Sequence, residues 1–221
     1  MIWTIPNILT ILRLLAAPGV AVMFLYFHRP WADWLALTLF IGAAITDWFD
    51  GYLARLWKQE SRFGAMLDPI ADKAMVVIAI MVITGYSGMN PWLILPATVI
   101  LFREVFVSGL REYLGPEQAA LLKVTRLAKW KTTAQMVAIA ILFLGTGLEY
   151  LEGITMRGMT PEQYAAAVEA GLADPIRTCG GRDCATYATN VGLVVIWLAA
   201  LLTFFTGLEY FRKALPYLGD R

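Results

Sequence analysis

Long apolar runs separated by short polar breaks dominate the chain. Six of them approach the roughly 20 residues that a helix needs to cross about 30 Å of hydrocarbon. They predict spans over residues 7–27, 32–54, 66–86, 92–112, 128–147 and 189–211. Glycines and prolines that favour helix ends mark the breaks at 28–30, 85–91 and 115–116. The pattern therefore predicts an all-α integral membrane protein with six transmembrane helices.

One long polar segment, 148–188, separates the last two spans of what we predict to be a single membrane domain over residues 1–221. Within it, Thr160 followed by proline has the pattern of a helix start and predicts a short helix that is too polar to span. The segment also holds both cysteines of the chain, Cys179 and Cys184. They fit a small disulfide in an oxidising compartment or two free thiols, and both interpretations stay open.

The composition supports a membrane protein. Hydrophobic residues make up 59% of the chain and charged residues 16%, against about 45–50% and about 25% in soluble domains. The formal net charge is only +1. It gives no global attraction to polyanions, so we expect no nucleic-acid partner.

The distribution of lysine and arginine predicts the orientation. An even number of spans puts both termini on one side, and the loops and helix ends of that side carry eleven Lys and Arg residues against four on the other. Cytoplasmic loops carry the excess of these residues, so we expect cytoplasmic termini and an extracytoplasmic loop at 148–188. The first run has no basic segment or cleavage site of a signal peptide, and we expect it to be a retained span.

Four aspartates interrupt the apolar pattern at the cytoplasmic ends of the second and third spans. Their faces follow from the rotation of about 100° per residue in a helix. One face of the second span carries two aspartates and two small residues, namely Asp47, Asp50, Gly51 and Ala54. On the next helix, Gly64, Asp68 and Asp72 repeat every four residues and share a face. Two adjacent antiparallel helices can therefore point two carboxylates each into one space.

Four unpaired carboxylates in one space would repel one another and take up protons. A divalent cation removes this repulsion, and carboxylate oxygens are ligands that suit Mg²⁺ and Mn²⁺. The alternative is that the aspartates lie in solvated helix ends or form ion pairs with Arg55 and Lys73. The two matched faces favour a functional site, since ionisable residues within spans are functional candidates by default.

The spacing of these residues resembles the signature of the CDP-alcohol phosphatidyltransferase family. The matching positions are Asp47, Asp50, Gly51, Ala54, Arg55, Gly64, Asp68 and Asp72. In that family a CDP-linked lipid or alcohol donates its phosphoryl unit to a hydroxyl group, and CMP leaves. The resemblance implies that Asp47, Asp50 and Asp68 bind two divalent ions, Mg²⁺ or Mn²⁺, and that Asp72 is the general base and a further metal ligand.

The same resemblance implies a site for the CDP donor at the cytoplasmic side. Gly51, Ala54 and Gly64 would leave room for the cytidine diphosphate, and Arg55 belongs to the same signature. Further candidates for contact with the donor, or for bracing an aspartate, lie before the signature and within it: Asn7, Thr10, Arg13 and Ser61.

Three more segments, 6–18, 102–114 and 129–136, resemble the bacterial phosphatidylglycerophosphate synthases of this family. The resemblance implies an enzyme of phospholipid biosynthesis with CDP-diacylglycerol as donor and sn-glycerol 3-phosphate as acceptor. It also implies a homodimer among the lipids of a bacterial inner membrane, with the active site facing the cytoplasm.

The phosphate of such an acceptor needs cations. We expect them from four residues near the cytoplasmic face: Arg103, Arg111, Lys129 and Lys131. Glu104 lies seven residues before Arg111 on the same helix face and would orient it. The alternative is that these cations only extend toward lipid head groups and set the topology.

Two other functions stay open. The same donor could serve another acceptor, such as serine, an inositol phosphate or phosphatidylglycerol, although a neutral acceptor has less use for the cations. A divalent-cation transporter would also explain an acidic cluster. Such a transporter favours carboxylates near the bilayer midplane, whereas here all four lie toward one end of the spans.

Overall fold

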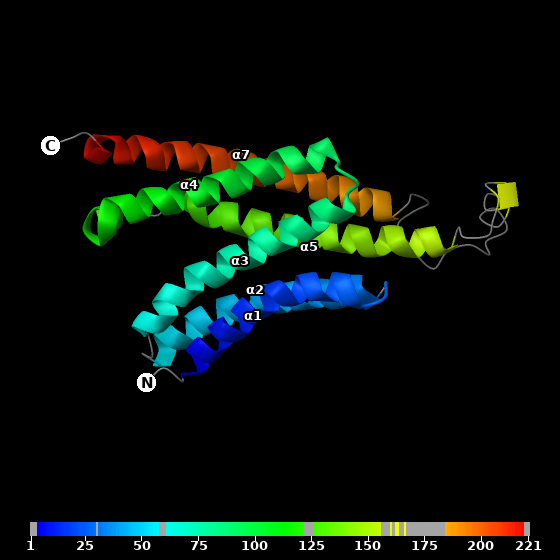
Figure 1. Ribbon diagram of the computed structural model, residues 1–221, viewed down its shortest axis with the longest axis horizontal. Coiled ribbons are helices and arrows are strands. Elements are labelled where there is room, and N and C mark those ends of the chain that lie inside the picture. Colours follow the sequence, from blue (N-terminus) through cyan, green and yellow to red (C-terminus); the bar gives the residue numbers. More distant parts are fainter. Residues whose placement is uncertain are drawn as a thin grey trace.

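The computed structural model of the protein is all-helical (Figure 1). It describes residues 4–29, 31–57, 61–121, 126–155 and 184–218, together with 160, 162, 163 and 166. Within these ranges the side chains at 6, 48–57, 62, 116–121, 126–129 and 151–155 are not described. The long helices of this part of the chain are α1 (Ile5–Tyr26), α2 (Trp31–Trp57), α3 (Arg62–Tyr86), α4 (Pro91–Leu121), α5 (Arg126–Thr155) and α7 (Cys184–Leu218).

The helices run back and forth, so the start of α1 and the end of α7 lie at the same end of the bundle (Figure 1). Helix α1 packs against α2 and α3, while α7 packs against α4 and α5. Helix α5 also contacts α2 and α3 and so joins the two groups. The end of α2, the start of α3, the end of α4 and the start of α5 lie at this same end of the bundle.

Five of the six predicted spans fall within these helices, and the first, 7–27, ends one residue past α1; most of the helices are longer than the spans. Within the described residues, four are long and apolar enough to cross a membrane: α1, α4, α5 and α7. Helices α2 and α3 carry the four aspartates. The chain is therefore an integral membrane protein, and six spans with cytoplasmic termini remain a prediction.

The predicted break at 115–116 appears as a kink inside α4. Gly115 has φ 71° and ψ 172°, a backbone conformation that glycine adopts without a side-chain clash. The following proline cannot donate to the preceding turn. The apolar part of α4 therefore ends here, and the helix resumes in another direction toward Leu121.

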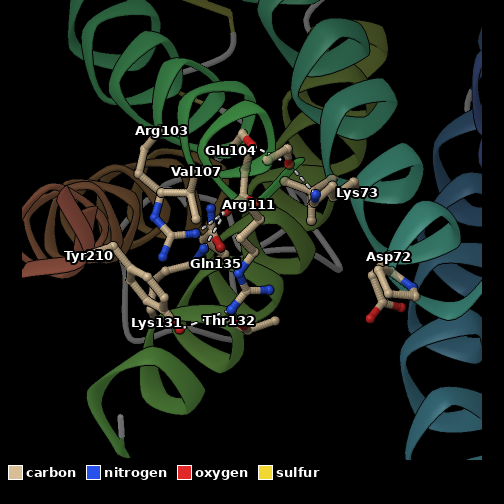
Figure 2. A pocket seen from close by; sticks show the side chains of 13 residues that line it. Asp72, Lys73, Arg103, Glu104, Val107, Arg111, Lys131, Thr132, Gln135 and Tyr210 are labelled. Atoms are coloured by element: carbon tan, nitrogen blue, oxygen red, sulfur yellow. Dashed lines mark hydrogen bonds and ion pairs between the residues drawn. The ribbon is translucent and has the colours of Figure 1, made fainter. Parts of the chain in front are cut away.

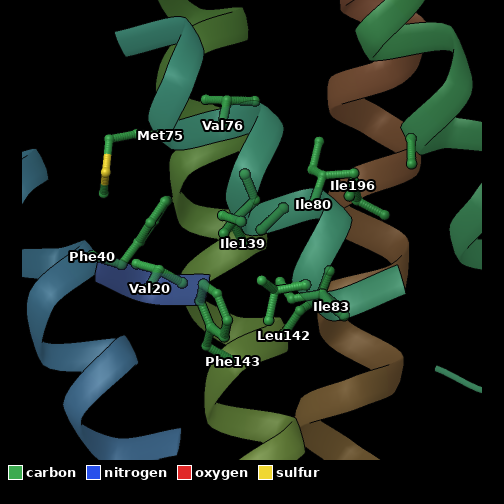
Figure 3. Close-up of a cluster of buried hydrophobic side chains, with 14 of the residues drawn as sticks. Val20, Phe40, Met75, Val76, Ile80, Ile83, Ile139, Leu142, Phe143 and Ile196 are labelled. Atoms are coloured by element: carbon green, nitrogen blue, oxygen red, sulfur yellow. The ribbon is translucent and has the colours of Figure 1, made fainter. Parts of the chain in front are cut away.

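The core lies where the two groups of helices meet around α5 (Figure 3). Phe143 of α5 stacks on Phe24 of α1 with ring centroids 5.8 Å apart and tilts against Phe40 of α2 at 5.7 Å. Ile139 of α5 and Ile196 of α7 are fully buried in the same cluster. Apolar side chains gain little by moving from lipid into a protein core. In a bilayer, van der Waals contacts in this densely packed cluster therefore hold the helices together.

A polar clamp closes the end of the bundle opposite the aspartates. The guanidinium of Arg29 donates to both carboxylate oxygens of Asp33, at 2.7 and 2.5 Å, and to the carbonyl of Thr146 at 2.8 Å. It also lies over the rings of Tyr86 and Tyr150, 5.0 and 4.5 Å from their centroids. Asp33 is completely buried, so the clamp ties α2, α3 and α5 to the α1–α2 connection through one ion pair.

Little of the predicted polar loop is described. The amide of Thr160 donates to Gln163 Oε1 at 3.0 Å, and Gln163 donates back to Thr160 Oγ1 at 3.3 Å. This reciprocal pair is a capping box and confirms Thr160 as a helix N-cap. Cys184 begins α7 and is disulfide-bonded, whereas Cys179 lies outside the described residues.

Candidate active site

Arg13 joins the two aspartate-bearing helices. From the buried side of α1, one nitrogen of its guanidinium donates to Asp72 Oδ1 of α3 at 2.8 Å and to Asp47 Oδ1 of α2. The Arg13 side chain is only 2% exposed, whereas those of Asp47 and Asp72 are 47% and 45% exposed. A buried cation therefore holds two half-open carboxylates side by side, which is the convergence expected from the helical faces.

Helix α1 also holds the start of α3. Thr10 donates to Asp68 Oδ1 at 2.7 Å. Ser61 caps α3 by accepting from the amide of Gly64 at 3.0 Å and donates to Asn7 Oδ1 at 2.8 Å. A Cβ at Gly64 would lie 2.7 Å from that same oxygen. In this structure the space beside Gly64 is thus taken by Asn7 and Ser61, and its predicted use for the nucleotide stays a prediction.

Several residues of the predicted site cannot be placed to the level of side chains. Within the helices these are Asp50, Gly51, Ala54, Arg55 and Lys129, which lie outside the described side chains. Among the residues that are described, no group of three His, Cys, Asp or Glu side chains forms a ready site for a metal ion. The donor set still fits a divalent cation, because it consists of carboxylate oxygens. Two of them, on Asp47 and Asp72, already bind a cation, the guanidinium of Arg13.

A second cluster lines a cavity of about 380 Å³ between α3, α4, α5 and α7 (Figure 2). Its charged lining residues are Asp72, Lys73, Arg103, Glu104, Arg111 and Lys131. Four cations against two carboxylates leave an excess of two positive charges, which matches a phosphate monoester near its second ionisation. In Figure 2 the two arginines and Lys131 gather on one side of the cavity, and Asp72 lies on the other.

Glu104 organises these cations with partners other than the expected one. It pairs with Lys131 of α5 and with Arg103 at 3.2 Å, whereas the sequence predicted that it orients Arg111. Arg111 instead donates to the hydroxyl of Tyr210 at 3.0 Å. The difference arises because α5 and α7 bring closer partners to these residues than the shared face of α4 provides.

The contribution of α7 was missed from the sequence. Tyr210 is 4% exposed, and its ring lies beneath both arginines, 5.6 Å from the guanidinium carbon of Arg103 and 5.2 Å from that of Arg111. One turn earlier, a Cβ at Gly207 would lie 2.8 Å from Cγ of Arg103. A small residue three positions before an aromatic one was the available signal, but it has no meaning until α7 is known to pack on α4.

Asp72 lies where this cavity meets another. A cavity of about 290 Å³ between α2, α3 and α5 is lined by Arg13, Asp47 and Asp72, by two threonines of α5, and otherwise by apolar residues. It shares Asp72, Val76 and Thr132 with the cation-lined cavity. It shares Ala44, Met136 and Val137 with an apolar groove of about 330 Å³ between α2 and α5. Within the described residues, Asp72 is therefore the carboxylate that faces both spaces.

Comparison with known proteins is consistent with this arrangement. The sequence profile of the CDP-alcohol phosphatidyltransferase family matches residues 3–205. A protein of Cereibacter sphaeroides named CDP-diacylglycerol–glycerol-3-phosphate 3-phosphatidyltransferase is 80% identical over 220 residues, covering 100% of this chain and 99% of that protein. Proteins of the same name from Escherichia coli K12 and Salmonella choleraesuis are 38% and 39% identical over 185 residues, covering 79% of this chain and all of theirs. The chain thus belongs to the CDP-alcohol phosphatidyltransferase family.

Proposed function

We propose that the protein transfers the phosphatidyl group of CDP-diacylglycerol to sn-glycerol 3-phosphate, giving phosphatidylglycerophosphate and CMP. Its relatives from three bacteria bear the name of this activity over all or most of this chain. The observation that carries the proposal is the position of Asp72, which forms part of the wall of both the cation-lined cavity and the aspartate-lined cavity. A base in that position reaches an acceptor in the first space and a donor in the second.

The donor occupies the space between α2, α3 and α5. Its acyl chains follow the apolar groove beyond Ala44 and Met136, where Ile41 and Ile45 are 40% and 51% exposed on the outside of the bundle. Its diphosphate lies at the polar end of the same space, near Asp47. A lipid substrate therefore keeps its apolar part beside the bilayer while its head group reaches the aspartates.

Divalent metal belongs to this donor site, since the family generally depends on it. Asp47, Asp50, Asp68 and Asp72 would hold Mg²⁺ or Mn²⁺, two ions in all. When bound, such ions screen the charge of a diphosphate and stabilise the CMP that leaves. Thr10 fixes one oxygen of Asp68 through a hydrogen bond, and Arg13 keeps Asp47 and Asp72 together.

The acceptor occupies the cation-lined cavity. Its phosphate pairs with Arg103, Arg111 and Lys131, where arginine supplies forked donors that match phosphate oxygens. Lys129 precedes Lys131 by two residues and belongs to the same predicted set. With the phosphate held here, a hydroxyl at the other end of the molecule points toward Asp72, across the cavity (Figure 2).

The chemical step is a substitution at the phosphorus that carries the diacylglycerol. The acceptor oxygen forms the new bond to this phosphorus, and the bond from phosphorus to the bridging oxygen breaks, so that CMP leaves with that oxygen. The proton of the hydroxyl passes to Asp72 as general base. A single base that borders both the acceptor and the donor site is thus enough for the transfer, and Asp72 is that base.

The proposed setting is a bacterial inner membrane with the active site facing the cytoplasm, where glycerol 3-phosphate is dissolved. Both termini would lie on the same side, and the enzyme would act as a homodimer. The excess of Lys and Arg on the loops of that side supports the orientation.

The test is CMP release by the purified protein in detergent with CDP-diacylglycerol. We expect release with glycerol 3-phosphate in Mg²⁺ or Mn²⁺, none after EDTA, and recovery when the metal is restored. Serine, an inositol phosphate and phosphatidylglycerol serve as alternative acceptors. Release of CMP with one of these and not with glycerol 3-phosphate would refute the acceptor, and no release with any acceptor would refute the transferase.

A further inference from the structure

The cation-lined cavity contains more donors than a phosphate needs, and several of them are uncharged: Ser108, Thr132, Gln135 and Tyr210. Gln135 lines this cavity on α5, one turn after Lys131 on the same face. Its side chain is only 3% exposed. Among the described residues its Nε2 has no hydrogen-bond partner.

A buried amide nitrogen without a partner is costly, because it has lost its hydrogen bonds to water and gained none in the protein. Such a group in a native structure needs an explanation, and a ligand that binds beside it would supply the missing hydrogen bond. Arg103 Nε, which is also without a partner among the described residues, lines the same cavity. A polar ligand in the cavity would therefore satisfy both groups. The Arg103 group is a charged donor, whereas the Gln135 group is a neutral one.

The charged groups account for the phosphate of that ligand. Arg103, Arg111 and Lys131 offer charge-assisted bonds, which are about twice as strong as those of a neutral amide. A phosphate therefore lies against these cations. Gln135 is displaced from Lys131 by one turn, about 6 Å along α5, and faces the next part of the bound molecule.

We propose that Gln135 is a specificity-determining residue that binds the middle hydroxyl of the acceptor. This inference rests on the proposed function. In glycerol 3-phosphate the phosphate is held by the cations and the reacting hydroxyl must lie at Asp72, so the remaining polar group is the hydroxyl between them. A hydroxyl can both donate and accept and is a suitable partner for a carboxamide at this level of the cavity.

The decisive substrate pair is glycerol 3-phosphate and 3-hydroxypropyl phosphate, which lacks only the middle hydroxyl. With the native chain we expect kcat/KM for CMP release to be at least about tenfold higher with glycerol 3-phosphate, since the analogue leaves the amide unpaired. Gln135→Met and Gln135→Leu replace the carboxamide by an apolar side chain of similar size. In both variants we expect the ratio of the two kcat/KM values to fall to within about twofold of one.

The matched control is Thr203→Val. Thr203 is also fully buried and its hydroxyl oxygen has no partner among the described residues, but it does not line the cavity. We expect this variant to keep the native ratio. Because both acceptors are assayed on one preparation, a loss of folded protein changes both rates and leaves the ratio unchanged.

Three results would overturn the inference: a native chain that does not distinguish the two acceptors, Gln135 variants that lose activity equally with both, or Gln135 variants that keep the native ratio. An equal loss would place the amide at the phosphate or make it purely structural. If the native chain releases no CMP with glycerol 3-phosphate, the proposed function itself fails, and that result is separate from the three above.

Discussion

Gly207 of α7 lies directly against the side chain of Arg103 of α4, so close that a Cβ at this position would stand 2.8 Å from Arg103 Cγ. Cγ is near the root of the arginine side chain and cannot move without a change of rotamer. The glycine therefore fixes the direction in which Arg103 enters the cation-lined cavity. It links the last helix of the chain to a site built mainly on α3, α4 and α5.

Gly207→Ala should displace Arg103 and weaken acceptor binding. Overpacking of this kind costs about 1–3 kcal/mol, and we expect the KM for glycerol 3-phosphate to rise while the KM for CDP-diacylglycerol stays unchanged. Gly109→Ala on α4 is the control, because a Cβ there meets nothing within 4 Å. An equal rise of both KM values in Gly207→Ala would contradict a specific effect on the acceptor side.

Arg111→Gln should remove a charged contact to the acceptor phosphate and leave Tyr210 without its donor. Hydrogen bonds to charged groups are worth about 1.5–3 kcal/mol, so kcat/KM for glycerol 3-phosphate should fall by about ten- to one-hundredfold. The exposed Arg212 provides the control as Arg212→Gln. Similar losses in the two variants would favour a general role of positive charge at the membrane face.

Asp72→Asn should remove turnover with a smaller effect on donor binding. The amide cannot take the proton of the acceptor hydroxyl, and loss of a general base typically costs about 10²–10⁴-fold in rate. CMP release gives the rate, and retention of the protein on CDP-diacylglycerol micelles gives donor binding. Half-exposed Glu209, which pairs with Lys213 one turn away, is the control as Glu209→Gln. Full activity in Asp72→Asn would exclude the base role.

Gly64→Ala should disturb the first turn of α3, because the new Cβ would lie 2.7 Å from Asn7 Oδ1 and 3.3 Å from Ser61 Oγ. The two oxygens must move apart, which breaks the cap. This displaces Asp68, which lies one turn after Gly64. We expect a lower kcat/KM for CDP-diacylglycerol and a higher requirement for metal in the titration of activity. Gly42→Ala, where a Cβ meets nothing within 4 Å, should behave like the native chain.

Arg29→Met should lower stability while leaving the chemistry intact. It leaves the carboxylate of Asp33 buried without its cation, and breaking a buried pair typically costs about 3–5 kcal/mol. Thermal unfolding in detergent should show a lower Tm, whereas kcat below the transition should be native-like, since the clamp lies at the end opposite the aspartates. Lys213→Met, at an exposed pair, is the control. An unchanged Tm would show that the clamp adds nothing to stability.

The sequence predicted the parts of this molecule that depend on local pattern. The six long helices follow from apolar runs, the kink follows from Gly115 and its proline, and the meeting of Asp47 with Asp72 follows from helical faces on two neighbouring helices. Arg13 was a candidate for bracing an aspartate only through the resemblance to the family. The roles of these residues in metal and donor binding remain predictions.

The sequence could not predict contacts that depend on how distant helices pack. Tyr210 is one of several aromatic residues on α7, and nothing in its neighbourhood distinguishes a residue beneath two arginines from one that faces lipid. Glu104 was paired with Arg111 because they share a helix face, but Lys131 from α5 lies closer. The neutral Gln135 became a candidate for substrate recognition only when its burial and lack of a partner were known.

The apolar groove between α2 and α5 determines which measure of donor concentration controls the reaction rate. A donor that reaches the aspartates from the side of the bundle diffuses in two dimensions and never enters bulk water. Its encounter rate then depends on its mole fraction in the bilayer or micelle, and adding inert detergent at constant total donor dilutes the substrate. The acceptor, which arrives from solution, follows ordinary molarity. The two substrates of one reaction are therefore counted in different units.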